Sequence, residues 1–103
     1  MYPMKSRAKA RDIRELMTVL SRVSSPKKTE AILRDLLSPK EFDDIVVRLQ
    51  IIKQLKRGIP QRQIAKNLGT GIATVTRGSR ELLDKSGGFH TVFREYETNK
   101  RKK

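Results

Sequence analysis

Apolar residues recur at helical spacing along this chain of 103 residues, and short polar clusters divide the pattern into segments. The first stripe predicts a helix over about residues 8–23, entered from a basic arm at residues 1–12. The second helix begins at Pro26, with Ser25 as its N-cap, and runs to Leu37. The apolar residues of these two stripes are Ile13, Leu16, Met17, Leu20, Val23, Ile32, Leu33, Leu36 and Leu37.

The third helix has the most complete start signal in the chain. Ser38 is a good N-cap, Pro39 suits the first helical position, and Glu41 closes a capping box three residues after the serine. A long apolar stripe follows and ends at Gly58, which suits the left-handed position after a helix. The pattern therefore predicts a helix of nearly twenty residues, with an apolar side made of Phe42, Ile45, Val46, Leu49, Ile52 and Leu55.

Residues 61–80 have the pattern of two short helices joined by a tight turn, within a helix-turn-helix at about residues 60–83. Ala65 supplies a small residue where the helices cross, and Gly69 supplies a residue free to turn four positions later. Val75 can lock the second helix onto the first. Before this segment, Pro60 suits the first turn of a helix, whereas Ile59 is a poor N-cap.

The end of the chain predicts one more helix. A break at residues 85–88 is followed by helical spacing from Phe89 to Tyr96, and then by a basic tail at residues 98–103. We therefore predict an all-α fold of five to six helices, with one helical domain at residues 13–97. A domain of this size buries limited apolar surface by itself, which favours a partner subunit.

The charge of the chain indicates a polyanionic partner. Twenty-four Lys and Arg against eleven Asp and Glu give a net charge of +13. Residues 45–80 contain eight of these cations and no acidic residue. A solvated surface normally mixes both signs, so nucleic acid is the favoured partner over a plain basic surface. RNA fits the basic ends of the chain, but a helix-turn-helix favours DNA.

Other classes of protein fit the sequence poorly. No apolar run is long enough for a membrane span, and the start of the chain lacks the apolar core of a signal peptide, so we expect a cytoplasmic protein associated with the nucleoid. The chain has no cysteine and one histidine, His90, so we expect no metal site. Asp43 and Asp44 are adjacent on a helix and face different directions. Residues 69–78 lack the Gly-Lys-Ser/Thr ending of a phosphate loop. We therefore do not expect an enzyme.

The segments LLSPKEFDDIVVRLQIIKQLKRG, QRQIAKNLG and GIATVTRGS together resemble the Trp repressor family of bacterial, tryptophan-sensing repressors. The similarity covers roughly residues 36–82. It implies an all-α, intertwined homodimer with a helix-turn-helix on each side. The second helix of each helix-turn-helix would enter the major groove of a palindromic operator, a docking geometry for which the Trp repressor family is itself an example. It also implies control of genes for tryptophan biosynthesis or uptake.

The resemblance also implies a site for L-tryptophan as corepressor. Arg48 and Arg77 match the two arginines whose guanidinium planes enclose the indole, a stacking role that lysine cannot fill. Thr74 and Gly78 match residues lining the pocket, with Gly78 leaving room for the ring. The carbonyls near Leu37 and the hydroxyl of Ser38, from across the dimer, would hold the ammonium group. Taken alone, Arg48 could instead pair with Asp44, and Arg77 could contact a phosphate.

The same resemblance assigns a DNA surface to the helix-turn-helix. Three residues of its second helix, Ile72, Ala73 and Thr76, would face base edges. Four others would lie near the phosphates of the DNA: Gln61, Arg62, Lys66 and Arg80. Gly71 is assigned to the same DNA-binding surface.

Two positions depart from the well-known members of the family. The segment between Gly58 and Gly69 is one residue shorter and lacks the usual Ser or Thr cap, as in a related branch of Trp-repressor-like regulators. Glu81 stands where a small hydroxyl residue lies near the ligand's amino group, so a carboxylate there could attract the ammonium or crowd it. The intact Arg77-Gly78-Ser79 favours a tryptophan response; the alternative is a basic regulator or architectural protein that does not respond to tryptophan.

Overall fold

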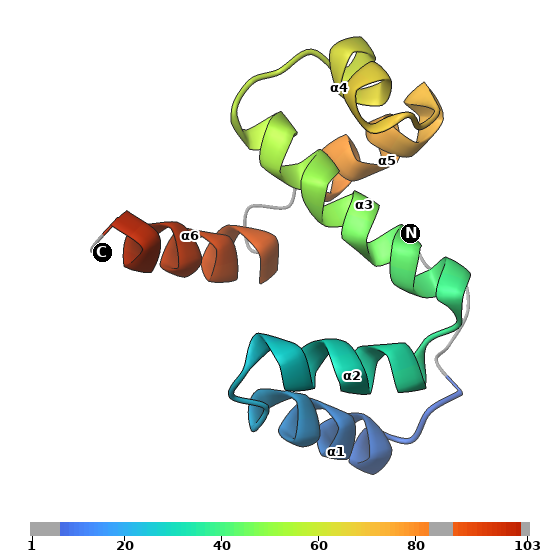
Figure 1. The fold of residues 1–103 in the computed structure, drawn as a ribbon, viewed down its shortest axis with the longest axis vertical. Helices are drawn as coiled ribbons and strands as arrows, with labels where there is room; N and C mark the ends of the chain where they lie inside the picture. The colour runs from blue at the N-terminus through green and yellow to red at the C-terminus, as the bar shows by residue number, and fades with distance from the viewer. Residues whose placement is uncertain (1–6, 83–87, 102–103) are drawn as a thin grey trace. The chain divides into compact units, whose positions relative to one another are not determined.

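The computed structural model describes residues 7–82 and 88–101, which form six helices and no strand. This confirms the all-α fold (Figure 1). The helices are α1 (Ala10–Ser21), α2 (Pro26–Leu36), α3 (Pro39–Lys56), α4 (Gln61–Leu68), α5 (Ile72–Leu82) and α6 (Gly88–Arg101).

The predicted caps account for where α2 and α3 begin. Ser25 accepts a hydrogen bond from the backbone N–H of Lys28 at 3.2 Å, with Pro26 in the first turn. At α3, the Glu41 carboxylate accepts from the Ser38 N–H at 2.8 Å, and the Ser38 hydroxyl oxygen accepts from the Glu41 N–H at 3.2 Å. The capping box is therefore present as predicted, and it satisfies two backbone donors that no helical carbonyl reaches.

Two glycines end α3 and α4. Gly58 and Gly69 have φ angles of 80° and 64°, in the left-handed region that costs glycine no side-chain clash. After α3, the N–H of Ile59 donates to the carbonyl of Gln54 at 3.1 Å, and the same bond recurs after α4 between Thr70 and Ala65 at 3.0 Å. Both ends are Schellman motifs, which turn the chain sharply after each helix.

Several helix boundaries differ from the sequence prediction. Pro60 is the N-cap of α4 rather than a residue of its first turn, and no side chain caps this helix. The last helix continues to Arg101, so two cations predicted for the tail are helical. α1 covers Ala10–Ser21, two residues shorter at each end than predicted, because helix ends fray where no side chain caps them. The predicted arm at residues 1–12 overlaps α1 from Ala10 onward, and Gly88 of the predicted break at residues 85–88 is the first residue of α6. Residues 1–6, 85–87 and 102–103 lie outside the described part of the chain.

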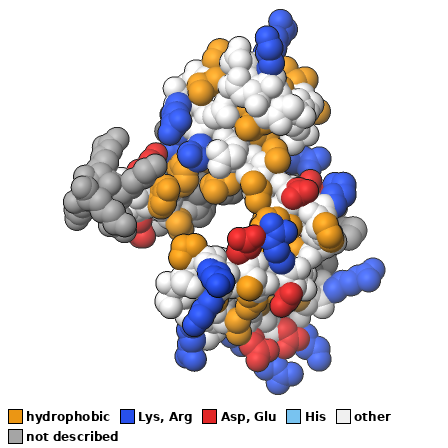
Figure 2. Space-filling model, viewed as in Figure 1, with side chains coloured by type: hydrophobic (Ala, Val, Ile, Leu, Met, Phe, Trp, Pro, Cys, Tyr) orange, Lys and Arg blue, Asp and Glu red, His pale blue; other side chains and the backbone are white. Residues whose placement is uncertain are grey.

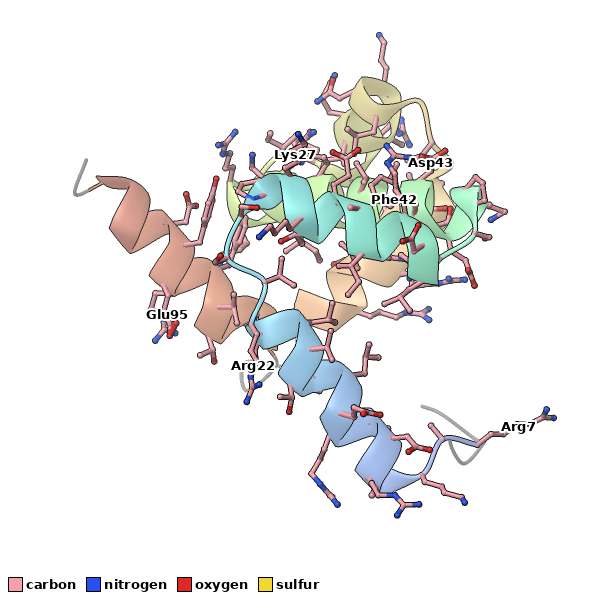
Figure 3. All side chains as sticks on the ribbon, turned by 60° about the horizontal axis from the view of Figure 1, so that its bottom comes forward. Arg7, Arg22, Lys27, Phe42, Asp43 and Glu95 are labelled. Atoms are coloured by element: carbon pink, nitrogen blue, oxygen red, sulfur yellow. The ribbon has the colours of Figure 1, made fainter. Side chains whose placement is uncertain are left out.

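The chain divides into two units, Met1–Phe42 and Asp43–Lys103. Figure 3 labels Phe42 and Asp43, the adjacent residues of α3 at which they meet. In the described part of the first unit no residue is buried. Arg34 makes two local contacts in this unit: its guanidinium lies 4.1 Å from the centre of the Phe42 ring and pairs with Glu30 at 2.7 Å.

The second unit contains the hydrophobic core. Ile51 of α3, Ile64 of α4 and Val75 of α5 are almost fully buried in one cluster. Ile52 and Phe93 are also buried, and the ammonium of Lys56 lies 5.6 Å from the centre of the Phe93 ring. Three helices from one stretch of chain are thus held together, with five partly buried residues around the cluster: Val47, Leu55, Ile59, Ala65 and Leu68.

Candidate functional site

The helix-turn-helix is built from α4 and α5, which pack against each other. Ile64 and Val75 are both completely buried, and Ala65 is partly buried beside them. A small residue at position 65 lets the helices approach, and Gly69 turns the chain between them. The predicted locking role of Val75 is confirmed.

The predicted site residues of α5 lie in two rows. Ile72, Thr76 and Arg80 follow one another at four-residue steps, so they share one side of the helix. Ile72 is half exposed and Arg80 is exposed, while Thr76 is partly buried. Thr74 and Gly78 form a second row, at an angle to the first and beside the buried Val75. Ile72, Thr76 and Arg80, which were predicted for DNA, therefore face a different direction from Thr74 and Gly78, which were predicted for a ligand. Ala73, predicted for DNA, and Arg77, predicted for the ligand, share one side between these rows and are both exposed.

At Gly78, α5 packs tightly against α3. A Cβ atom added to Gly78 would lie 2.7 Å from Cγ2 of Ile51 and 3.7 Å from Cδ1 of Leu55. Such a short approach means that an alanine would require Ile51 to move. Helix packing by itself therefore explains the glycine, a reason that its sequence neighbourhood does not reveal because Ile51 is 27 residues away.

The two predicted stacking arginines belong to the helices that meet at Gly78. Arg48 lies one turn before Ile51 on α3, and Arg77 immediately precedes Gly78 on α5. Both side chains are exposed. The helices that carry the two guanidinium groups, α3 and α5, are therefore in contact with each other. Both arginine side chains remain exposed to solvent.

Gln61 and Thr76, both predicted to contact DNA, are joined to each other. The Thr76 hydroxyl donates to Oε1 of Gln61 at 2.8 Å and lies 3.0 Å from the carbonyl oxygen of Ile72. This bond links the first residue of α4 to the second turn of α5. Arg62 and Lys66 are exposed on α4. At Gly71, before α5, an added Cβ would meet nothing within 4 Å.

A chain of amides also ties α4 to α3, and the sequence analysis missed it. Nε2 of Gln63 donates to Oδ1 of Asn67 at 2.6 Å, and Nδ2 of Asn67 donates to Oε1 of Gln54 at 2.9 Å. The i, i+4 spacing of Gln63 and Asn67 could have predicted the bond between these two side chains, because residues at this spacing are neighbours on a helix. The second bond joins residues 13 positions apart, which only the fold brings together.

The remaining predicted ligand residues lie at helix ends. Leu37 follows α2 as its C-cap, and its N–H donates to the Leu33 carbonyl at 2.9 Å. The Ser38 oxygen already accepts one hydrogen bond in the capping box, and a hydroxyl oxygen has a second acceptor position. Both residues belong to the first unit. Glu81 lies in the last turn of α5.

The surface carries many cations and several apolar side chains. Figure 2 shows Lys and Arg side chains projecting from the face in view, with hydrophobic side chains also reaching the surface.

Across residues 7–82 and 88–101, no three His, Asp or Glu side chains are grouped as metal ligands. None of the helices described is long and apolar enough to cross a membrane. His90 is partly buried on α6.

The helices and the site define a class: small, basic, all-α proteins with a helix-turn-helix docked on a longer helix. The family model of the Trp repressor protein matches residues 11–97, and the chain belongs to this family of transcription regulators.

Individual relatives agree with the family match. A Trp operon repressor homolog of Vibrio parahaemolyticus is 38% identical over 77 residues, which cover 74% of this chain and 75% of that protein. A homolog of Vibrio atlanticus is 36% identical over 84 residues, covering 81% and 86% of the two chains. No solved structure gives a significant match.

Proposed function

We propose that this protein is a sequence-specific DNA-binding repressor that uses L-tryptophan as corepressor to control genes of tryptophan biosynthesis or uptake. It acts in the cytoplasm, on operator DNA, as a homodimer. Membership of the Trp repressor family supports the regulatory class. The two exposed arginines, Arg48 on α3 and Arg77 on α5, lie on helices that contact each other near Gly78, and this pairing is the observation on which the ligand-dependent mechanism mainly rests.

The proposed ligand site lies where α3 meets α5. Arg48 and Arg77 stack on the two faces of the indole, and Arg77 also pairs with the carboxylate. Thr74 and Gly78 line the pocket on α5. Because both arginines are exposed, they can reach a ligand without losing a buried partner.

The partner subunit completes this site in the proposal. The carbonyl of Leu37 and the hydroxyl of Ser38 accept hydrogen bonds from the ligand ammonium, which also lies near Glu81. A helix C-terminus such as that of α2 presents carbonyls and partial negative charge. This arrangement makes ligand binding depend on dimerisation.

Tryptophan acts in this proposal by shifting a population. A ligand between α3 and α5 stabilises the orientation of α5 that fits the major groove, and it does so only as far as it binds that orientation better than others. Val75 and Gly78 pack α5 against the core along one side of the helix. A ligand beside Gly78 would therefore act on the orientation of a helix that is already packed on that side.

The proposed DNA surface is the exposed row of α5 together with the start of α4. Ile72, Ala73 and Thr76 face base edges. The basic and polar side chains around these three residues bind phosphates of the DNA: Gln61, Arg62, Lys66 and Arg80. Gly71, which has no side chain, lets the turn between α4 and α5 approach the DNA backbone. The stretch of residues 45–80 without an acidic side chain favours this role, because no carboxylate of the stretch repels the phosphates.

The experiment that tests the proposal is a titration with L-tryptophan followed by binding to a pool of palindromic DNA at stated salt. The protein contains no tryptophan, so indole emission reports the ligand directly. We expect binding in the micromolar to millimolar range and tighter DNA binding when the ligand is present. If tryptophan neither binds nor tightens DNA binding, the corepressor role is wrong.

A matched pair of variants on α5 separates the two surfaces. Arg77→Ala should abolish the tryptophan response, because it removes a stacking face and the carboxylate partner. Arg80→Ala, three residues away and also exposed, should weaken DNA binding while leaving tryptophan affinity unchanged. Equal loss of tryptophan affinity in both variants would contradict the division of α5 into two surfaces.

A second function is a regulator of the same fold that does not respond to tryptophan. The uncapped start of α4 at Pro60 and the packing explanation for Gly78 favour it. Such a protein would bind DNA with the same affinity with and without the ligand, so the same titration distinguishes the two functions.

A further inference from the structure

The Thr76 hydroxyl has two acceptors inside the protein and a single proton. Oε1 of Gln61 lies 2.8 Å away, and the carbonyl oxygen of Ile72 lies 3.0 Å away. A threonine hydroxyl donates one hydrogen bond and accepts up to two. The proton of Thr76 is therefore used within the helix-turn-helix, and its oxygen retains the capacity to accept.

This conclusion does not depend on how the Gln61 amide is oriented. The oxygen and nitrogen of an amide are assigned from its hydrogen bonds. If the amide were reversed, its NH₂ group would donate to Thr76, and the Thr76 proton would still go to the Ile72 carbonyl. In either orientation the Thr76 proton is used within the protein, and the hydroxyl oxygen can still accept a hydrogen bond.

An acceptor distinguishes between the groups that DNA offers. Phosphate oxygens, guanine O6 and N7, and thymine O4 are themselves acceptors. The major-groove donors are the amino groups of adenine (N6) and cytosine (N4). A hydroxyl whose proton is already used within the protein can therefore accept from these amino groups but has no proton to donate to phosphate, guanine or thymine.

We propose that Gln61 is a positioning residue that makes Thr76 a hydrogen-bond acceptor. The protein then selects operator half-sites in which an adenine or cytosine amino group lies opposite Thr76. This rests on the proposed DNA-binding function and adds a chemical rule for one base. Gln61 retains amide donors for a phosphate while its oxygen holds Thr76. The Gln61 side chain thus links a contact with the DNA backbone to the recognition of a base by Thr76.

The test uses the DNA sequence that the wild-type protein selects from a palindromic pool in the presence of L-tryptophan. Amino groups are then removed one position at a time, by replacing adenine with purine and cytosine with 2-pyrimidinone. At one position per half-site, removal should weaken wild-type binding about three- to tenfold, as expected for one hydrogen bond. In Thr76→Val, which keeps the shape and lacks the hydroxyl, removal at that position should have no effect.

Three further variants make the test specific. Thr76→Ser keeps the hydroxyl and should retain the dependence on the amino group. Gln61→Leu should reduce that dependence, because of the hydroxyl's two acceptors in the protein the Ile72 carbonyl then remains, and acceptors of the DNA compete with it for the Thr76 proton. Arg62→Ala is the control: it should weaken binding to every DNA variant alike and leave the amino dependence intact. Thermal melting of each variant checks that it is folded.

The outcomes separate this inference from the function on which it rests. If the wild-type protein selects no sequence, the proposed function fails and the inference with it. If it selects a sequence and no amino group shows a Thr76-dependent effect, the inference alone is wrong. It is also wrong if 7-deazaguanine, which lacks the N7 acceptor, weakens wild-type binding at a position where it has no effect on Thr76→Val.

Discussion

The two units of this chain have similar apolar patterns and very different burial. In the second unit, Ile51, Ile64 and Val75 are at most 1% exposed. In the first unit, α1 has an equally regular apolar stripe, yet none of its residues is buried, and Ile13 and Leu16 are both 40% exposed. A regular stripe therefore shows which side of a helix is apolar, and not whether the same chain covers it.

This difference indicates what the first unit requires. A helix of 12 residues is marginal by itself in water, because most helical stability in proteins comes from packing of the apolar side. The helix-turn-helix has that packing within its own unit, and α1 does not. The proposed homodimer would supply it, since a second copy brings an apolar surface of the same kind.

The largest expected effect comes from placing a charge on the α1 stripe. Leu16→Glu should weaken the dimer more than about 100-fold, because each subunit would bury an unpaired carboxylate. Sedimentation measures this as a shift to monomer. Arg14→Glu, on the polar side of the same helix, is the control and should remain dimeric. A dimer of unchanged affinity in Leu16→Glu would show that α1 is not part of the interface.

The next effect concerns the core of the second unit. Ile64→Ala should lower the free energy of unfolding by about 2–5 kcal/mol, because it leaves a cavity at a fully buried site. Ile72→Ala, an identical substitution at a half-exposed residue of the same unit, should cost less than about 0.5 kcal/mol. Chemical denaturation measures both. Equal losses would mean that the second unit lacks a core of its own.

A smaller effect is expected where α5 meets α3. Gly78→Ala should cost about 1–3 kcal/mol, because the new methyl group overlaps Cγ2 of Ile51. Gly71→Ala meets nothing within 4 Å and should be nearly neutral. In an Ile51→Ala background the cost of Gly78→Ala should fall, since the clashing atom is gone. An unchanged cost there would assign the effect to the backbone of Gly78 instead.

The smallest effect tests local capping in the first unit. Ser38→Ala should lower stability by about 1 kcal/mol, since it removes the oxygen that accepts from the Glu41 N–H. Glu41→Gln should cost much less, because an amide oxygen can still accept from the Ser38 N–H. Thermal melting compares the two. A Ser38→Ala protein as stable as wild type would mean that packing alone sets the start of α3.

Much of the fold could be predicted because its signals are local. Ser25, Ser38 and Glu41 cap the residues beside them, and Gly58 and Gly69 turn the chain where they stand. Pro60 was misplaced by one position because the start of α4 has no capping side chain to mark it. The last helix was predicted too short, since charged residues at its end are compatible with both a helix and a tail.

The sequence supplied candidate site residues, whereas the contacts that these residues make came from the structure. The sequence by itself determined the helices, the apolar side of each, the basic character of residues 45–80 and the resemblance that assigns Arg48 and Arg77 to one ligand. Only the tertiary structure decided that Ile51 fills the space beside Gly78, that Gln61 holds the Thr76 hydroxyl, and that no residue of α1 is buried. The physical reason is range: caps and turns act over a few residues, whereas these contacts join residues far apart in the sequence, and the covering of α1 requires atoms outside its unit.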